Sequence, residues 1–278
     1  MTFTEWCAFK LHAARTLYRM IRWLENWPEV WSAYRQQKPL PLLRFRDGFT
    51  LHYGSHDDPV SLLHEIFGER HYTKYLTIPT DGVMIDLGAN IGLVTLDWAS
   101  KVRQVRIHAY EPNPSTNRIL QRNIDANGLG QRVTVHPEAV AGAPGEMRLW
   151  TNVHSMIATG YSDTAPRSGA IAETVPVIDL NEVVRRAGGS VALLKMDTEG
   201  AEAETLEGAT AATLRSIGQM VLEYHESLCP NALTRCRKVL EGADFHCRIR
   251  PINPTQGLIY AQRGTAGATR REGKANGA

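Results

Sequence analysis

The sequence predicts an α/β fold in which helices cover both faces of a mostly parallel β-sheet. Apolar runs of strand length alternate with helical patterns from Val83 onward. The first run leads into a glycine turn, Asp86-Leu-Gly-Ala-Asn-Ile-Gly92, and the second run ends at an acid, Glu111. Because ligands of such sheets bind beyond the carboxyl ends of the strands, the pattern predicts a nucleoside pocket at that edge.

Length, charge and cysteine content narrow the class of protein. The 278 residues fit one α/β domain with an appended N-terminal segment, and a formal net charge of +2 gives no signal for nucleic acid as a partner. The four cysteines form no C-x-x-C pair and the N-terminus is too charged for a signal peptide, so we expect a cytoplasmic protein with free thiols. No apolar run is long enough to span a bilayer.

Residues 2–27 are expected to be helical, because apolar side chains recur at three- and four-residue steps until Pro28. Four of the six tryptophans are interleaved with arginines in and just after this segment: Trp6, Trp23, Trp27 and Trp31. The first interpretation is a helix that packs on the domain or on a second copy in a homodimer. The second is a peripheral anchor on an anionic membrane, for which tryptophan and arginine are suited.

The next segment is a lead-in to the core. Leu42–Tyr53 alternates apolar and polar residues around Asp47-Gly48, which predicts a β-hairpin with a type I′ turn. Pro59–Phe67 is expected to be a short helix that ends at Gly68.

The core itself alternates strands and helices. The predicted parallel strands are Val83–Leu87, Val105–Tyr110, Val133–His136, Val191–Met196 and Gln219–Tyr224. The predicted helices are Ile91–Ser100, Ser115–Asn127, Leu180–Arg186, Ala201–Leu214 and Asn231–Leu240. A last antiparallel pair, Phe245–Arg250 and Gly257–Gln262, completes the predicted sheet.

The stretch after the third strand breaks this rhythm. Met147–Trp150 and Thr174–Ile178 are expected to be extended, whereas Thr151–Ala170 is rich in small and polar residues. Long loops in compact domains are often lids, so we expect this one to cover the site, with His154 and Ser155 facing the substrate.

The glycine turn favours one kind of nucleoside. Gly88 and Gly92 permit a tight turn and close approach of the backbone to a ligand. Free N–H groups at the start of the helix suit the carboxylate of a methionine moiety, and Asp86 could accept from the turn or from a ligand ammonium group. Because the turn lacks the G-x-G-x-x-G spacing of dinucleotide sites, S-adenosylmethionine (SAM) is the expected ligand rather than NAD.

Two further acids follow strands at the same edge. Glu111 could accept hydrogen bonds from both ribose hydroxyls. Glu138, after the third strand, could meet the adenine amino group or could be an exposed loop acid.

Charged residues cluster where the fourth strand ends. Lys195 and Asp197 lie inside or at the lip of an apolar strand, so a buried pair between Lys195 and a carboxylate is expected. Such a cluster can shift pKa values enough for acid–base chemistry. Asp197 and His225 are therefore the candidate general bases, with Glu199 behind them.

Metal sites are the alternative at this edge. Asp197, Glu223 and His225 could hold a divalent cation, but their spacing does not require one, and a metal-free site is preferred. Several His and Cys residues near the C-terminus match no common zinc pattern: His225, Cys229, Cys236, His246 and Cys247. The cysteines among them are interpreted as buried thiols.

These motifs together resemble the FkbM family of SAM-dependent methyltransferases. The resemblance covers residues 42–262 and is most specific in Leu194-Lys-Met-Asp-Thr-Glu-Gly-Ala-Glu202. Other similar segments are Asp86–Gly92, Glu111-Pro-Asn113, Asn123-x-x-x-Asn-Gly128, Val175–Leu180 and the lead-in Glu65–Tyr72. Thr198 departs from the aliphatic residue that is common in the signature, without an evident consequence for chemistry.

The resemblance implies a Rossmann-like class I methyltransferase fold. It implies that SAM is bound by Asp86, Gly88, Asn90, Gly92 and Glu111. It also implies a signature edge formed by Lys195, Asp197, Glu199 and Glu202. We accordingly divide the chain into an amphipathic helical segment (1–41), a hairpin and helix lead-in (42–80), a SAM-binding methyltransferase domain (81–264) and a disordered tail (265–278).

The resulting hypothesis is an O-methyltransferase that acts on a small-molecule or glycan hydroxyl. We expect that hydroxyl to belong to a sugar in a glycan or glycoconjugate precursor. This expectation rests on the breadth of acceptors in the family that the chain resembles and on the possible N-terminal membrane anchor. The alternatives are a nucleotide-dependent oxidoreductase and a catalytically silent scaffold in a membrane-associated assembly.

Overall fold

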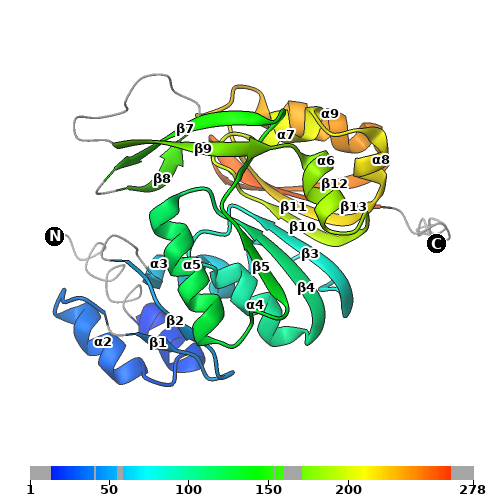
Figure 1. Cartoon of the computed structure of the whole chain (residues 1–278). Coiled ribbons are helices and arrows are strands. Elements are labelled where there is room, and N and C mark those ends of the chain that lie inside the picture. Colours follow the sequence, from blue (N-terminus) through cyan, green and yellow to red (C-terminus); the bar gives the residue numbers. More distant parts are fainter. Residues whose placement is uncertain (1–13, 41, 55–58, 153–154, 160–170, 264–278) are drawn as a thin grey trace, which may run out of the picture.

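The structure is a computed structural model that describes residues 14–40, 42–54, 59–152, 155–159 and 171–263. A seven-stranded sheet forms its centre, in the order β12-β13-β11-β10-β3-β4-β5 (Figure 1). The strands are β3 (Asp81–Leu87), β4 (Gln104–Tyr110), β5 (Val133–His136), β10 (Val191–Met196), β11 (Ile217–His225), β12 (Phe245–Asn253) and β13 (Gln256–Arg263). β3, β4, β5, β10 and β11 are parallel, and β13 is antiparallel to both of its neighbours. The predicted fold class and its antiparallel edge are confirmed.

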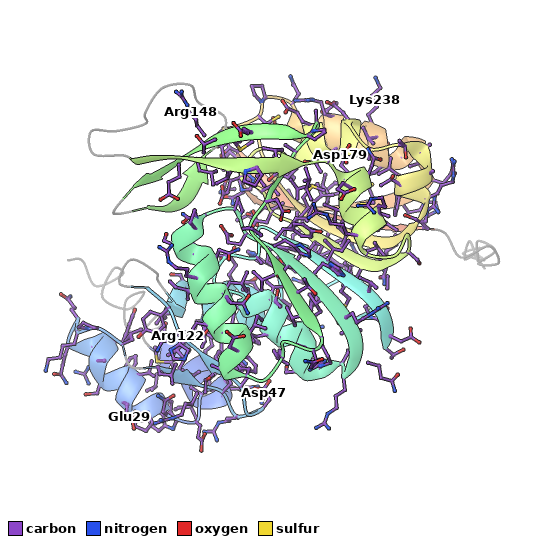
Figure 2. All side chains as sticks on the ribbon, viewed as in Figure 1. Glu29, Asp47, Arg122, Arg148, Asp179 and Lys238 are labelled. Atoms are coloured by element: carbon purple, nitrogen blue, oxygen red, sulfur yellow. The ribbon has the colours of Figure 1, made fainter. Side chains whose placement is uncertain are left out.

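Helices cover both faces of this sheet because alternate strand residues are apolar on opposite sides. Met84 and Leu193 join one core with α4 (Leu93–Lys101) and α5 (Pro114–Ala126). Ile85 and Leu194 join the other core. The helices on that second side are α6 (Leu180–Arg186), α7 (Glu202–Glu207), α8 (Ala211–Arg215) and α9 (Ala232–Gly242). Charged side chains such as Glu29, Arg148 and Lys238 lie at the periphery (Figure 2).

The helix predicted over Ala201–Leu214 is wrong in one respect, because it is divided into α7 and α8. A Cβ atom at Gly208, where α7 ends, would lie 2.0 Å from the carbonyl oxygen of Gly142, so this position requires glycine. The helix is interrupted at Thr210, whose backbone is extended. Thr210 then caps α8 by accepting from the Thr213 N–H at 3.1 Å.

The hairpin is present, but its predicted type I′ turn is wrong. β1 (Leu43–Arg44) pairs with β2 (Thr50–Leu51), and the Phe45 N–H donates to the Phe49 carbonyl at 2.9 Å. The connection therefore has three residues, of which Gly48 alone has a positive φ, of 95°. This is the arrangement in which a type I turn is followed by a left-handed glycine.

The N-terminal part packs beside α4 and α5 (Figure 1). Residues 14–23 are helical and are followed by α2 (Trp27–Arg35), so the single helix expected over 2–27 is interrupted near Leu24. Trp23, Trp27 and Trp31 are partly buried against the core, while Trp6 lies outside the described residues. This packing agrees with the first interpretation for these three side chains; contact with a membrane or a second copy stays a prediction.

Shorter elements complete the lead-in and the end of the chain. The helix expected over Pro59–Phe67 is α3 (Pro59–Leu63) followed by a π-helical turn, η1 (His64–Gly68). The tail 265–278 lies outside the described residues. Among the residues that the structure describes, no helix is long and apolar enough to cross a membrane.

A second sheet lies beyond what the sequence predicts. β6 (Ala139–Val140), β9 (Ile171–Ile178), β7 (Gly145–Asn152) and β8 (Ser155–Thr159) pair in the order β6-β9-β7-β8. The two extended segments predicted here are confirmed within β7 and β9. The loop expected at Thr151–Ala170 is wrong for its described residues, because 151–152 and 155–159 are strand, in β7 and β8. Residues 160–170 and His154 lie outside the described residues.

Two asparagines, Asn123 in α5 and Asn127 at its C-terminal cap, dock the hairpin onto the domain. The side chain of Asn123, which is fully buried, accepts from the His52 N–H at 2.6 Å and donates to the His52 and Ile91 carbonyls at 2.9 and 2.7 Å. Asn127 repeats the pattern on Thr50, accepting at 2.7 Å and donating at 2.8 Å. The two amides thus take the place of a neighbouring strand at the edge of the hairpin.

We predict that Asn123→Leu lowers the free energy of unfolding by about 2–4 kcal/mol, because it leaves backbone groups of His52 and Ile91 without partners. Chemical denaturation measures the change. Gln121→Ala, on the exposed side of the same helix, is the matched control and should change it by less than about 0.5 kcal/mol. Equal effects from the two variants would contradict this role of Asn123.

Candidate active site

Two cavities meet at the carboxyl ends of β3 and β10. The first lies between the central sheet and the second sheet and encloses about 810 Å³, part of it open to solvent. The second is bounded by the lead-in segment and encloses about 830 Å³, also partly open to solvent. Four residues line both cavities and form their junction: Gly88, Asn90, Asp197 and Glu199.

The turn after β3 can be made only with glycine at position 88. Gly88 has a φ of 72°, and a Cβ atom there would lie 1.8 Å from the carbonyl oxygen of Asp197. Asn90 and Glu199 have φ values of 51° and 52°, which are left-handed conformations that non-glycine residues rarely adopt. Such backbone strain concentrates at functional sites, and here both strained residues lie at the junction of the cavities.

Asp86 and Gly92 support this turn from behind and line neither cavity. Asp86 is fully buried, and its Oδ2 accepts from the Thr95 hydroxyl at 2.6 Å. Gly92, with a φ of 93°, starts α4, and a Cβ atom there would lie 2.6 Å from Leu120 Cδ1. The structure therefore gives Asp86 an internal partner and Gly92 a packing function.

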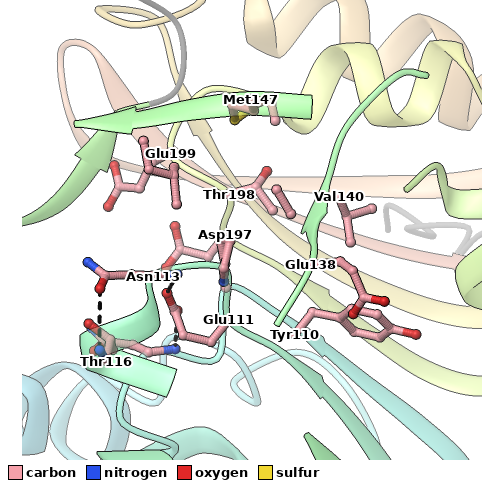
Figure 3. Close-up of a pocket in the computed structure, with 16 residues that line it drawn as sticks. Tyr110, Glu111, Asn113, Thr116, Glu138, Val140, Met147, Asp197, Thr198 and Glu199 are labelled. Carbon is pink, nitrogen blue, oxygen red and sulfur yellow. Dashed lines mark hydrogen bonds between the residues drawn. The ribbon is translucent and has the colours of Figure 1, made fainter. Parts of the chain in front are cut away.

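Glu111 lies in the wall of the first cavity (Figure 3). Its carboxylate accepts from the N–H groups of Asn90 and Asn113, both at 2.9 Å, and so ties the glycine turn to the start of α5. Burial raises the pKa of Glu111 to about 7, although these two hydrogen bonds oppose the shift.

The same cavity holds buried polar atoms that have no hydrogen-bond partner among the described residues: Glu138 Oε2, Thr198 Oγ1 and Asp197 Oδ1. The other carboxylate oxygen of Glu138 accepts from Arg186 Nη1 at 2.7 Å. Apolar side chains from the second sheet face these groups, and Met147 lies across the cavity from Glu111 (Figure 3). Unpartnered acceptors beside apolar surface fit the amino group and the flat faces of an adenine ring.

Lys195 holds the ends of β3 and β10 together from inside. Its side chain is 3% exposed, and Nζ donates to the Gly88 and Leu87 carbonyls at 2.6 and 3.2 Å. Nζ also lies 3.2 Å from Asp86 Oδ1 and 3.9 Å from Asp197 Oδ2. Although burial lowers the pKa of Lys195, the negative charge of Asp86 and then of Asp197 raises it overall. The predicted pairing of Lys195 with a carboxylate is confirmed.

Tyr72, from the lead-in, joins two acids at the second cavity. Its hydroxyl lies 2.9 Å from Asp197 Oδ2 and 3.0 Å from Glu223 Oε2. One hydroxyl proton can be donated to only one of these oxygens, so the other contact needs a second proton. Burial and the charge of Asp197 raise the pKa of Glu223 to about 8, which lets Glu223 carry that proton at neutral pH.

His225 lies behind the acids and lines neither cavity. Its Nδ1 is 3.2 Å from Glu202 Oε1, and its Nε2 is 3.6 Å from Glu199 Oε2 and 3.8 Å from Glu223 Oε1. Burial lowers the pKa of His225, but the hydrogen bond and charge of Glu202, together with the other acids, raise it to about 9. A protonated imidazole in this position stabilises the carboxylates rather than accepting a proton from a substrate.

Glu202 closes the turn after β10. It is fully buried and accepts from the Thr198 and Gly200 N–H groups at 3.0 and 3.1 Å. The signature segment thus has two functions, because Asp197 and Glu199 face the cavities while Lys195 and Glu202 fix the backbone that carries them.

Two groups among the described residues could hold a metal ion. The first group is Glu65, His71 and Glu223, and the second is Asp197, Glu199 and His225. Within each group the possible ligand atoms lie within 4.8 Å of one another. The metal site predicted as an alternative combined residues of both groups, because Glu223 is in the first and Asp197 and His225 are in the second. A histidine with a pKa of about 9 is a poor ligand at neutral pH, because metal binding must displace its proton. Cys229 and Cys236 are buried free thiols, as expected, whereas Cys247 is only half-buried.

Sequence reasoning missed three residues of the second cavity: Glu65, Tyr72 and Gln256. Glu65 and Tyr72 begin and end a lead-in segment that the sequence marks only through its family resemblance. Gln256 starts β13 and donates to Glu223 Oε1. No local pattern marks these positions, since they reach the cavity only through the tertiary fold.

We predict that Lys195→Met destabilises the protein by about 3–5 kcal/mol, because the fully buried Asp86 loses its counter-charge. Urea denaturation measures the change. The double variant Asp86→Asn/Lys195→Met should recover part of the loss, because it leaves no unpaired charge. If the losses of stability measured for Asp86→Asn and for Lys195→Met simply add in the double variant, the two side chains do not stabilise each other as an ion pair.

Comparison with known proteins identifies the family to which this chain belongs. Residues 86–247 match the model of the methyltransferase FkbM domain. AMB antimetabolite synthetase AmbE of Pseudomonas aeruginosa is 28% identical over 196 residues, which are 58% of this chain but only 9% of that protein. The 31-O-demethyl-FK506 methyltransferase FkbM of Streptomyces tacrolimicus is 27% identical over 232 residues, 73% of this chain and 88% of that one. Hexuronic acid methyltransferase AglP of Haloferax volcanii is 29% identical over 189 residues, 66% and 71% of the two chains.

Proposed function

Because the chain belongs to the FkbM family of class I, SAM-dependent methyltransferases, we propose that it methylates a hydroxyl oxygen, in a sugar of a glycan or glycoconjugate precursor. The observation that carries this proposal is the junction of the two cavities. Asp197 and Glu199 face both of them, so a cofactor in the first and an acceptor in the second would meet beside two carboxylates. The oxidoreductase alternative is set aside by the family.

The first cavity has the residues that a SAM site requires. Glu111 would accept from the ribose hydroxyls, and the unpartnered Glu138 Oε2 would accept from the adenine amino group. Gly88 and Asn90 would bring backbone close to the methionine part of the molecule. Bound SAM supplies an electrophilic methyl group on a sulfonium ion.

The acids at the junction would remove the acceptor proton. A hydroxyl that forms a bond to carbon must lose its proton, and a carboxylate within hydrogen-bond reach can take it. Burial and the negative charge of Asp197 raise the pKa of Glu199 to about 7, near the pH at which a base is most effective. Asp197 Oδ1 is the other candidate, since it is buried and free of hydrogen bonds within the described structure.

Two relatives support the kind of acceptor. The name of the Streptomyces protein specifies an O-linked methyl group, and that of the Haloferax protein specifies a sugar derivative. Both proteins align with most of their length. Oxygen as the acceptor atom and sugar as the acceptor class are proposed for this chain on that basis.

We predict that SAM at about a hundredfold excess over its Kd raises the melting temperature by roughly 5 °C, as mass action requires for a ligand of the native state. Differential scanning fluorimetry measures the shift. Glu111→Ala should abolish it, whereas Glu241→Gln, on the exposed surface of α9, should retain it. A folded wild-type protein that shows neither a shift nor a heat of binding would favour the scaffold alternative.

We further predict that kcat falls as the pH is lowered through about 7, because Glu199 accepts protons only when ionised. Glu199→Gln should remove that limb of the profile and lower kcat by about 10²-fold or more, and Asp197→Asn should lower kcat similarly. SAM affinity, measured by calorimetry, should remain in both variants. Unchanged turnover in both would clear the two residues of this role.

A further inference from the structure

The second cavity has an acidic wall. Four carboxyl groups from separate parts of the fold line it: Glu65, Asp197, Glu199 and Glu223. Glu65 lies on η1, Asp197 and Glu199 follow β10, and Glu223 is on β11. Their convergence is therefore a property of the tertiary structure and not of one acidic segment.

Aliphatic side chains also line this cavity. They come from α3, η1, the start of α4 and the turn before it: Leu62, Ile66, Ala89, Ile91, Leu93 and Val94. The cavity therefore presents both carboxyl groups and hydrocarbon. A molecule that fills it needs polar hydrogens as well as C–H groups.

No basic group among the described residues that line this cavity is free to bind an anion. Lys195 is the one basic side chain among them. Its ammonium group already donates to two carbonyls and pairs with Asp86 and Asp197. The basic side chains nearby are also paired with acids, since His71 Nδ1 lies 3.1 Å from Glu65 Oε1 and Arg250 Nη2 lies 2.7 Å from Glu69 Oε2.

Given the methyl transfer proposed above, we propose that this cavity selects a neutral hydroxyl compound and rejects acceptors that carry a carboxylate or phosphate beside the reacting hydroxyl. Like charges confined in a poorly solvated site repel each other strongly. Neutral hydroxyl groups instead donate to the carboxylates. The C–H groups of a sugar or another alcohol then contact the aliphatic side chains. The acceptor would differ in charge from the hexuronic acid named for the Haloferax relative.

The charge of the methylated residue tests this proposal even while the acceptor is unidentified. The full-length protein is incubated with radiolabelled SAM and a cell extract, and the products are treated with alkali to remove methyl esters. Acid hydrolysis then releases the labelled residue, which is passed over an anion exchanger at neutral pH. We expect the label in the unretained fraction. Label that is retained and eluted by salt would overturn the charge selection.

Variants that remove one negative charge test whether the carboxyl groups of the cavity cause the selection against anionic acceptors. Glu65→Gln keeps the shape of the side chain but removes one negative charge, so the retained fraction should rise at least about fivefold relative to the unretained one. Glu241→Gln, far from the cavity on α9, should leave the ratio unchanged. An identical ratio for Glu65→Gln would contradict the proposal. If no product is labelled although SAM binds, the methyl transfer itself is wrong and the selection falls with it.

Discussion

The buried ammonium group of Lys195 is the interaction on which the site depends. It joins the carbonyls at the end of β3 to the carboxylates of Asp86 and Asp197, and so holds two parallel strands at a fixed separation. The backbone approach between Gly88 and Asp197 is possible only at that separation and only without a Cβ atom. Both cavities open from this point, because the turn after β3 and the turn after β10 form their common wall.

The surrounding structure divides the functions of a methyltransferase between two appended parts. The second sheet closes the first cavity with apolar side chains, and the lead-in closes the second with Glu65 and Tyr72. Asn123 and Asn127 fix the lead-in hairpin to α5, the helix whose start is tied to Glu111. The hairpin and the wall of the first cavity are therefore connected through one helix.

The fold and part of the lining of the first cavity could be predicted from the sequence because their signals are local. Strand periodicity, the glycine turn and the acid after the second strand each occupy a few consecutive residues. The roles of Asp86, Gly92 and His225 could not be predicted, since position at a strand end does not reveal whether a side chain turns toward a cavity or toward a buried partner such as Lys195. Tyr72 and the second sheet depend on long-range packing, which leaves no pattern in the sequence.

The most direct measurement of the central claim is a crystal structure with bound S-adenosylhomocysteine, the demethylated form of the proposed cofactor. The account predicts the nucleoside between Glu111 and the second sheet, with the sulfur atom at the junction formed by Asp197 and Glu199. A nucleoside bound elsewhere, or a sulfur atom directed away from the second cavity, would contradict it.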